Sequence, residues 1–100
     1  MNAQKSIQGT WHTGEDNTLI EIKEVNGVCN GELLSTNKAD AKIGAVVLKD
    51  VKAAGSKWKG KLYSPKKKDW FDAEFETKGE KLIITVKSGF MSKTVHWTKK

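Results

Sequence analysis

Short segments in which apolar and polar residues alternate fill most of the chain, and turn residues separate them about every eight to twelve positions. This spacing is typical of a barrel or sandwich of short antiparallel strands, and no helical periodicity competes with it. The pattern predicts eight strands: Ile7 to Thr13, Thr18 to Val25, Val28 to Ser35, Lys42 to Val51, Lys57 to Tyr63, Asp69 to Glu76, Lys81 to Lys87 and Ser92 to Thr98.

The fourth segment is the least regular. Its apolar residues, with Ala41, Ala45, Ala53 and Ala54 around it, run together without a clear period of two. A helical turn is therefore an open alternative to a strand there.

The hairpins test which side chains share a face, because residues directly opposite in an antiparallel pair point the same way. Asn26-Gly27 is a strong signal for a two-residue turn and places Val25 opposite Val28. One face of this hairpin then carries Ile20, Ile22, Cys29 and Leu33.

A turn at Lys78-Gly79 would likewise separate an apolar from a polar face. The pairs that it predicts are Phe75 with Leu82, Ala73 with Ile84, Phe71 with Val86, Glu76 with Lys81 and Asp72 with Thr85. A turn around Ser88-Gly89 places Met91, Lys93, Val95 and Trp97 on the inner face and Ser92, Thr94 and His96 outside. Lys93 is then an inward-pointing charge.

An even number of consecutive antiparallel strands brings the first and last together, which removes the exposed edges of the sheet. A register that pairs Trp11 with Trp97 also pairs His12 with His96, and it turns both indoles inward. We therefore predict an all-β fold, an eight-stranded antiparallel up-and-down barrel. It would be a single domain over residues 1–100, in which residues 1–6 form a flexible extension.

Length and charge narrow the function classes. One hundred residues suffice for one core, and no apolar stretch approaches the roughly 18 residues of a spanning helix. The chain has 18 Lys, no Arg and 12 acidic residues, for a net charge of +6. Because bidentate recognition of bases is mostly the work of Arg, we expect no sequence-specific nucleic-acid binding. The lysines could attract anionic surfaces, but we favour a role in solubility.

Cys29 is the only cysteine, which excludes an intrachain disulfide and a multi-cysteine metal site. We expect its thiol to be free, half buried near the Asn26-Gly27 turn and without a catalytic role. The N-terminus has no apolar core of a signal peptide, so we expect either a cytosolic chain or a mature exported form with a start Met.

No motif for catalysis or for a cofactor is present in the sequence. We therefore expect neither an enzyme nor a bound cofactor. Asp72, Glu74 and Glu76 alternate along one strand, which predicts a solvated face opposite lysines rather than an acid and base pair. His12 and His96 would offer only two imidazoles to Cu, Ni or Zn, so we favour ordinary surface histidines and predict no metal site.

Lys66, Lys67 and Lys68 precede Asp69 and an outward-pointing Trp70. The run could form a patch for an anionic surface or partner with the indole as its anchor. We favour the alternative of a polar loop with Trp70 lying over the barrel wall.

Gly9-Thr10-Trp11 resembles the start of calycin barrels, in which this indole closes one end under a basic residue of the last strand. Trp11 and Lys93 would match those roles, with Lys99 as a second candidate for the basic residue. The segment from Gly9 through Ile20 to Leu33 also looks like the opening of avidin-type barrels.

Nearly the whole chain resembles a bacterial family of small exported proteins of unknown function with lipocalin-like barrels. The motifs that carry this resemblance are Gly9-x-Trp11, Ile43-Gly44, Trp58-x-Gly60-x-x-Tyr63-x-Pro65 and Val95-His96-Trp97-Thr98-Lys99. The resemblance implies a lipocalin-like fold and a periplasmic or secreted location.

An eight-stranded barrel either fills with side chains or holds one small ligand. Gly31, Gly60 and Ala73 would leave space near the middle, which favours a cavity. We predict a non-enzymatic carrier of a small, largely apolar ligand such as a fatty acid, including one that bears a carboxylate. The alternative is an interaction module that binds an anionic surface or a protein partner through its lysine-rich outer face. The predicted ligand contacts are Trp11, Trp58, Leu62, Phe71, Phe75, Ile84, Met91, Lys93 and Trp97.

Overall fold

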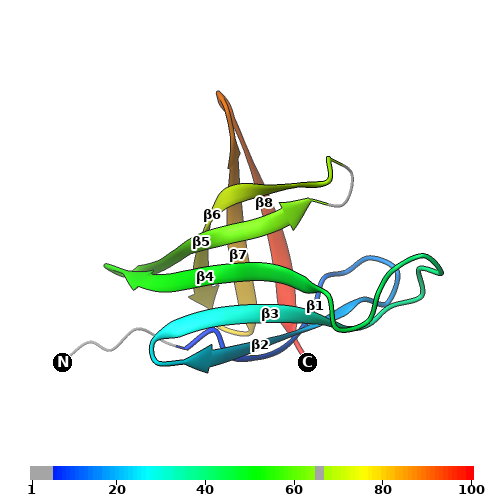
Figure 1. Ribbon diagram of the computed structural model, residues 1–100. Helices are drawn as coiled ribbons and strands as arrows, with labels where there is room; N and C mark the ends of the chain where they lie inside the picture. Colours follow the sequence, from blue (N-terminus) through cyan, green and yellow to red (C-terminus); the bar gives the residue numbers. More distant parts are fainter. Residues whose placement is uncertain (1–5, 65–66) are drawn as a thin grey trace.

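The computed structural model describes residues 6–64 and 67–100 (Figure 1). It confirms the all-β prediction: eight antiparallel strands form a closed barrel in which each strand pairs with the next and the last returns to the first. The strands are β1 (Gly9–His12), β2 (Leu19–Val25), β3 (Val28–Ser35), β4 (Val46–Ala54), β5 (Lys57–Ser64), β6 (Asp69–Lys78), β7 (Lys81–Ser88) and β8 (Met91–Lys99).

The β2–β3 hairpin has the predicted register. Val25 lies opposite Val28, and Ile20 lies opposite Leu33. Asn26 and Gly27 both have positive φ, at 53° and 81°, which is the backbone that a type I′ turn requires. Asn and Gly adopt it at low steric cost, so these two residues determine the register by themselves.

The β6–β7 hairpin turns one residue later than predicted. Its two loop residues are Gly79 and Glu80, because the positive φ of 63° at Gly79 occupies the first loop position, as in a type II′ turn. Each residue of β6 therefore pairs with the residue of β7 two positions after the predicted one, so the predicted pairs are wrong. The observed pairs are Phe75 with Ile84, Ala73 with Val86, Asp72 with Lys87, Glu76 with Ile83 and Lys78 with Lys81. A shift of two keeps every side chain on its predicted face.

The same shift occurs where the barrel closes. Trp11 lies opposite Lys99 and His12 opposite Thr98, so the predicted pairing of the two tryptophans and of the two histidines is wrong. The reason is that β8 continues one residue beyond its predicted end, and the amide of Lys100 donates a hydrogen bond to the carbonyl of Thr10 at 3.0 Å. Both indoles still point inward and are buried.

β4 begins four residues after its predicted start and contains a bulge. Lys49 pairs with Lys61 and Lys52 with Lys59, so two residues, Asp50 and Val51, lie opposite one residue of β5. Asp50 has a φ of 54°. The bulge turns both Leu48 and Val51 into the interior, although they are three positions apart.

These two side chains fill the middle of the barrel, so the expectation of free space there is wrong. A Cβ on Gly31 would lie 2.7 Å from Cγ of Leu48, and one on Gly60 would lie 2.5 Å from Cγ2 of Val51. The buried core consists of Ile7, Trp11, Ile20, Ile22, Cys29, Leu33, Leu48, Val51, Trp58, Ala73, Phe75, Leu82, Ile84 and Trp97.

One end of the barrel is closed by this core. The β2–β3, β4–β5 and β6–β7 turns and the C-terminus lie at this closed end (Figure 1). Trp11 donates a hydrogen bond from Nε1 to the carbonyl of Ile7 at 2.9 Å, and Ile7 is fully buried. Cys29 is also fully buried, which corrects the expectation of a half-buried thiol.

Candidate functional site: the open mouth of the barrel

The mouth of the barrel is the end opposite the closed end. In an up-and-down barrel alternate connections share an end, so the β1–β2, β3–β4, β5–β6 and β7–β8 connections surround the mouth. The β7–β8 hairpin stands away from the β1–β2 and β3–β4 loops (Figure 1). Between the strands lies an open hollow of about 1230 Å³.

Apolar and aromatic side chains from the mouth halves of the strands and from the β3–β4 loop line the hollow. They are Ile20, Leu33, Ala41, Ala45, Val46, Val47, Leu62, Tyr63, Trp70, Phe71, Val86, Met91, Val95 and Trp97. Leu62, Val86 and Val95 are partly buried and pack against the core below them. The hollow therefore has an apolar floor that is continuous with the core.

The rim of the hollow carries charge. Its charged members are Lys38, Lys42, Lys67, Lys68, Lys93, Glu15, Asp16 and Asp40. Five lysines against three carboxylates make the rim net positive. Nζ of Lys67 lies 5.3 Å from the centroid of the Phe71 ring, so one cation is held directly over the apolar floor.

Hydrogen bonds join two of the loops at the mouth. The hydroxyls of Thr18 and Thr36 lie 2.8 Å apart, and the amide of Asn37 donates to the carbonyl of Asp16 at 2.8 Å. These bonds connect the β1–β2 and β3–β4 loops and give that side of the rim a defined shape.

The structure divides the predicted ligand contacts into two groups. Five line the hollow: Leu62, Phe71, Met91, Lys93 and Trp97. The other four, Trp11, Trp58, Phe75 and Ile84, belong to the packed core and do not line it. All nine share the inner face, but only those on the mouth halves of their strands reach the open space.

Lys93 occupies an inner-face position opposite Val86 and lines the hollow. Its side chain is exposed to water at the mouth, so the expectation that Lys93 is the basic residue over Trp11 is wrong. The physical reason is that Lys93 lies near the tip of the β7–β8 hairpin, which stands away from the β1–β2 and β3–β4 loops (Figure 1). The basic residue over Trp11 is Lys99, whose Nζ lies 4.9 Å from the ring centroid and donates to the carbonyl of Gln8 at 3.2 Å.

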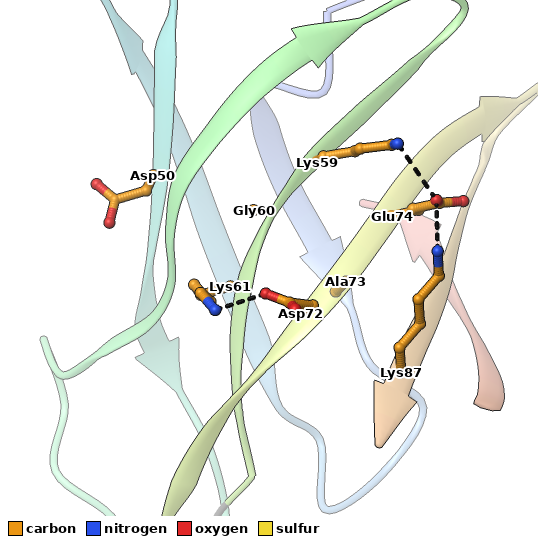
Figure 2. A pocket seen from close by; sticks show the side chains of 8 residues that line it. All are labelled: Asp50, Lys59, Gly60, Lys61, Asp72, Ala73, Glu74 and Lys87. Atoms are coloured by element: carbon orange, nitrogen blue, oxygen red, sulfur yellow. Dashed lines mark hydrogen bonds and ion pairs between the residues drawn. The ribbon is translucent and has the colours of Figure 1, made fainter. Parts of the chain in front are cut away.

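The outer wall of β5, β6 and β7 carries the predicted face of carboxylates opposite lysines (Figure 2). Lys61 donates a hydrogen bond to Asp72, and Lys87 donates to Glu74 at 2.9 Å. Lys57 and Lys59 approach Glu74 at 3.7 and 3.8 Å.

These contacts lower the pKa of both carboxyl groups, that of Asp72 through the hydrogen bond from Lys61 and that of Glu74 through the one from Lys87. The shallow hollow of about 400 Å³ between these side chains is a surface of ion pairs, and its lysine charge is partly neutralised.

Trp70 pairs with Tyr63 on the outer face of the wall, and it also borders the hollow together with Lys67 and Lys68. Its ring makes an edge contact with Tyr63 at 5.3 Å between centroids, and Nζ of Lys49 lies 4.2 Å from its centroid. Of the lysine run before it, Lys67 and Lys68 line the hollow, whereas Lys66 lies outside the described residues.

His12 faces Thr98 rather than His96. Within residues 6–64 and 67–100, no group of three or more His, Cys, Asp or Glu side chains could hold a metal ion. No helix in this part of the chain is long and apolar enough to cross a membrane.

Sequence reasoning missed the contribution of the β3–β4 loop to the mouth. Lys38, Ala41 and Lys42 lie in the loop of residues 36–45, whose second half was predicted as the start of a strand. A usable signal was the connectivity itself, because the predicted up-and-down order already placed this loop at the same end as Lys67 and Lys68.

The chain matches, over residues 9–99, the family described as "Uncharacterized protein conserved in bacteria (DUF2147)". This stretch contains all eight strands. The chain belongs to DUF2147. The prediction of an uncharacterised bacterial family is thereby confirmed, while the description of DUF2147 names neither a lipocalin-like fold nor export. Comparison with curated proteins and with solved structures gave no match.

Proposed function

We propose that the protein is a non-enzymatic, lipocalin-like carrier of a small, largely apolar ligand with an anionic end, such as a fatty acid. The observation that carries this proposal is the combination of an apolar floor with a net positive rim around one hollow. Small-molecule sites typically occupy roughly 300–1,000 Å³ and combine an apolar lining with a few polar groups. The hollow of about 1230 Å³ has room for such a ligand.

The proposed arrangement places the apolar part of the ligand against Leu62, Phe71 and Trp97 and its anionic end near Lys67 and Lys93. Phe71 and Leu62 are partly exposed at the floor, so covering them would remove apolar surface from water. The two lysines form no ion pair with any residue in the described ranges, which leaves their ammonium groups able to meet a carboxylate.

The alternative of a binding face made of outer-wall lysines has weaker support. Lys59, Lys61 and Lys87 on that wall already contact Glu74 or Asp72. An anionic partner would have to compete with these carboxylates, which reduces the attraction that the lysine count suggests.

Titration with a dansyl-labelled fatty acid tests the carrier. Binding should shift the dansyl emission to the blue and quench Trp97, whose indole lines the hollow. Lys93→Met should weaken binding by about 1 to 3 kcal/mol while the protein folds normally. Phe71→Ser should also weaken it, because it removes apolar surface from the floor.

Two exposed residues away from the mouth provide matched controls. Lys52→Met removes one lysine from β4, and Val25→Ser removes one apolar side chain from the end of β2; both should leave uptake unchanged. The carrier would be refuted if the parent protein took up no fatty acid. It would also be refuted if Lys93→Met and Phe71→Ser both bound the fatty acid as tightly as the parent does. Native mass spectrometry of protein from its natural host should reveal a copurifying apolar acid.

A further inference from the structure

Two large apolar side chains at the mouth lie in water and do not line the hollow. Phe90 is 108% exposed, and Ile43 is 62% exposed. Phe90 is the second loop residue of the β7–β8 turn, after Gly89 with its φ of 62°. Turn positions favour Gly, Asn, Asp and Ser, so the hairpin does not itself require a phenylalanine there.

Exposed apolar side chains concentrate at this end of the molecule. Single exposed apolar residues are ordinary on protein surfaces, but their distribution here is uneven. Five of the six large exposed ones within the described residues lie at the mouth end, namely Leu34, Ile43, Val46, Phe90 and Met91. The sixth, Val25, lies beside the β2–β3 turn at the closed end.

Three lysines lie on or beside the connections that carry or neighbour these exposed apolar side chains. Lys67 and Lys68 follow β5, and Lys93 lies three residues after Phe90. None of the three forms an ion pair with another described residue. Asp69 is the carboxylate next to them, and it accepts a hydrogen bond from the amide of Trp70 at 2.8 Å. The β5–β6 and β7–β8 side of the mouth is therefore basic, whereas Glu15 and Asp16 belong to the β1–β2 loop and Asp40, with Lys38 and Lys42, to the β3–β4 loop.

We propose that the mouth end docks on an anionic lipid bilayer, with Phe90 and Ile43 entering the interfacial region and Lys67, Lys68 and Lys93 among the headgroups. Apolar side chains that enter the acyl boundary and lysines that meet anionic headgroups are the two forces that bind proteins to such surfaces. Docking does not require that the hollow carries a ligand. It would bring the mouth to a surface from which a fatty acid could enter.

A bilayer fits the arrangement better than a folded protein partner. Phe90 belongs to the β7–β8 turn and Ile43 to the β3–β4 connection, and these two connections stand apart from each other (Figure 1). A stable protein interface needs roughly 800 Å² of complementary surface on each partner. A fluid headgroup layer has no fixed shape and can accept separate apolar points with cations between them.

Vesicle co-sedimentation tests the docking. The parent protein should bind vesicles of phosphatidylcholine with phosphatidylglycerol, bind pure phosphatidylcholine more weakly, and dissociate as salt is raised. The double variant Phe90→Ser/Ile43→Ser should lower the partition coefficient about tenfold or more, because it removes two interfacial side chains. Val25→Ser is the matched control and should bind as the parent does.

A label reports the orientation. Phe90→Cys carrying an NBD dye should shift its emission to the blue when the phosphatidylglycerol vesicles are added, and Val25→Cys with the same dye should not. Cys29 should label slowly, because it is fully buried and burial raises the pKa of its thiol.

Three results would overturn docking: a parent that does not bind the vesicles, a double variant that binds as well as the parent, or an equal loss in Val25→Ser. If the protein does not bind vesicles but captures another protein in a way that depends on Phe90, the docking proposal is wrong and the surface binds a protein partner. Fatty-acid uptake measured on the same variants separates the two proposals, since Phe90 and Ile43 lie outside the hollow lining. If the parent binds vesicles but takes up no fatty acid, only the carrier proposal is refuted. If it takes up fatty acid but does not bind vesicles, only the docking proposal is refuted.

Discussion

Two lysines of β8 lie on the inner side of the strand in different surroundings. Lys99 lies over the Trp11 ring and donates to the carbonyl of Gln8, whereas Lys93 is exposed at the rim. Exposed cation–π contacts are worth about 0.5 to 1 kcal/mol. Lys99→Gln should therefore lower the free energy of unfolding by about that amount, and Lys93→Gln should change it by less than about 0.5 kcal/mol. Urea denaturation of both variants measures this, and a larger effect at Lys93 would contradict the assignment.

Cys29 gives a residue-scale prediction about pH. Burial, with a smaller contribution from Glu24, raises the pKa of its thiol from 9.0 to about 11. The folded protein therefore keeps the proton at pH values where the unfolded chain has lost it. The resulting stability is fully present below about pH 9 and is lost as the pH rises to about 11.

The measurement compares the parent with Cys29→Ala, because both contain the same titrating lysines. The free energy of unfolding of the parent, relative to that of the variant, should fall between pH 8 and pH 11. A difference that does not change with pH, or rapid alkylation of Cys29 at neutral pH, would show that the thiol is not held in an apolar site.

At the scale of the element, the bulge of β4 determines how the middle of the barrel is filled. It holds Val51 against Gly60, and the amide of Asp50 donates to Oδ1 of Asn30 on β3 at 3.2 Å. A methyl group on Gly31 would meet the side chain of Leu48, but one on Gly60 would also meet backbone, with Cα of Val51 at 2.7 Å. Side chains can move aside more easily than backbone can.

Gly31→Ala and Gly60→Ala should each destabilise the barrel, by about 1 to 3 kcal/mol or more, because both overfill a packed site. In double-mutant cycles, Leu48→Ala should relieve much of the effect of Gly31→Ala, whereas Val51→Ala should relieve less of the effect of Gly60→Ala. Chemical denaturation measures all six variants. If Val51→Ala restored as much stability to Gly60→Ala as Leu48→Ala restores to Gly31→Ala, the backbone of β4 would be able to move away from Gly60.

At the scale of the whole molecule, the seam between β1 and β8 is the shortest pairing of the closed sheet. It contains two register pairs, against eight between β7 and β8. Local opening should begin where few backbone hydrogen bonds must break. Amide exchange followed by NMR should therefore be faster at Thr10 and Lys100 than at the centre of β7. Slower exchange at the seam than within β7 would contradict this order.

The sequence by itself determined the number of strands, the hairpin at Asn26-Gly27 and the inward direction of Trp11 and Trp97. These properties depend on local chemistry: turn residues punctuate the chain, and a period of two assigns each side chain to a face. The inner-face assignment also found Leu62, Phe71 and Trp97, which line the hollow.

Only the tertiary structure decided the pairing of Trp11 with Lys99, the bulge at Asp50 and the position of the hollow at the mouth. A register shift of two leaves every face unchanged, so alternation cannot detect it. One bulged residue breaks the period, which hid the inward direction of Leu48 and Val51. How far the β7–β8 hairpin stands from the other loops depends on the packing of the whole barrel, and this separation decides which inner-face residues line open space rather than core.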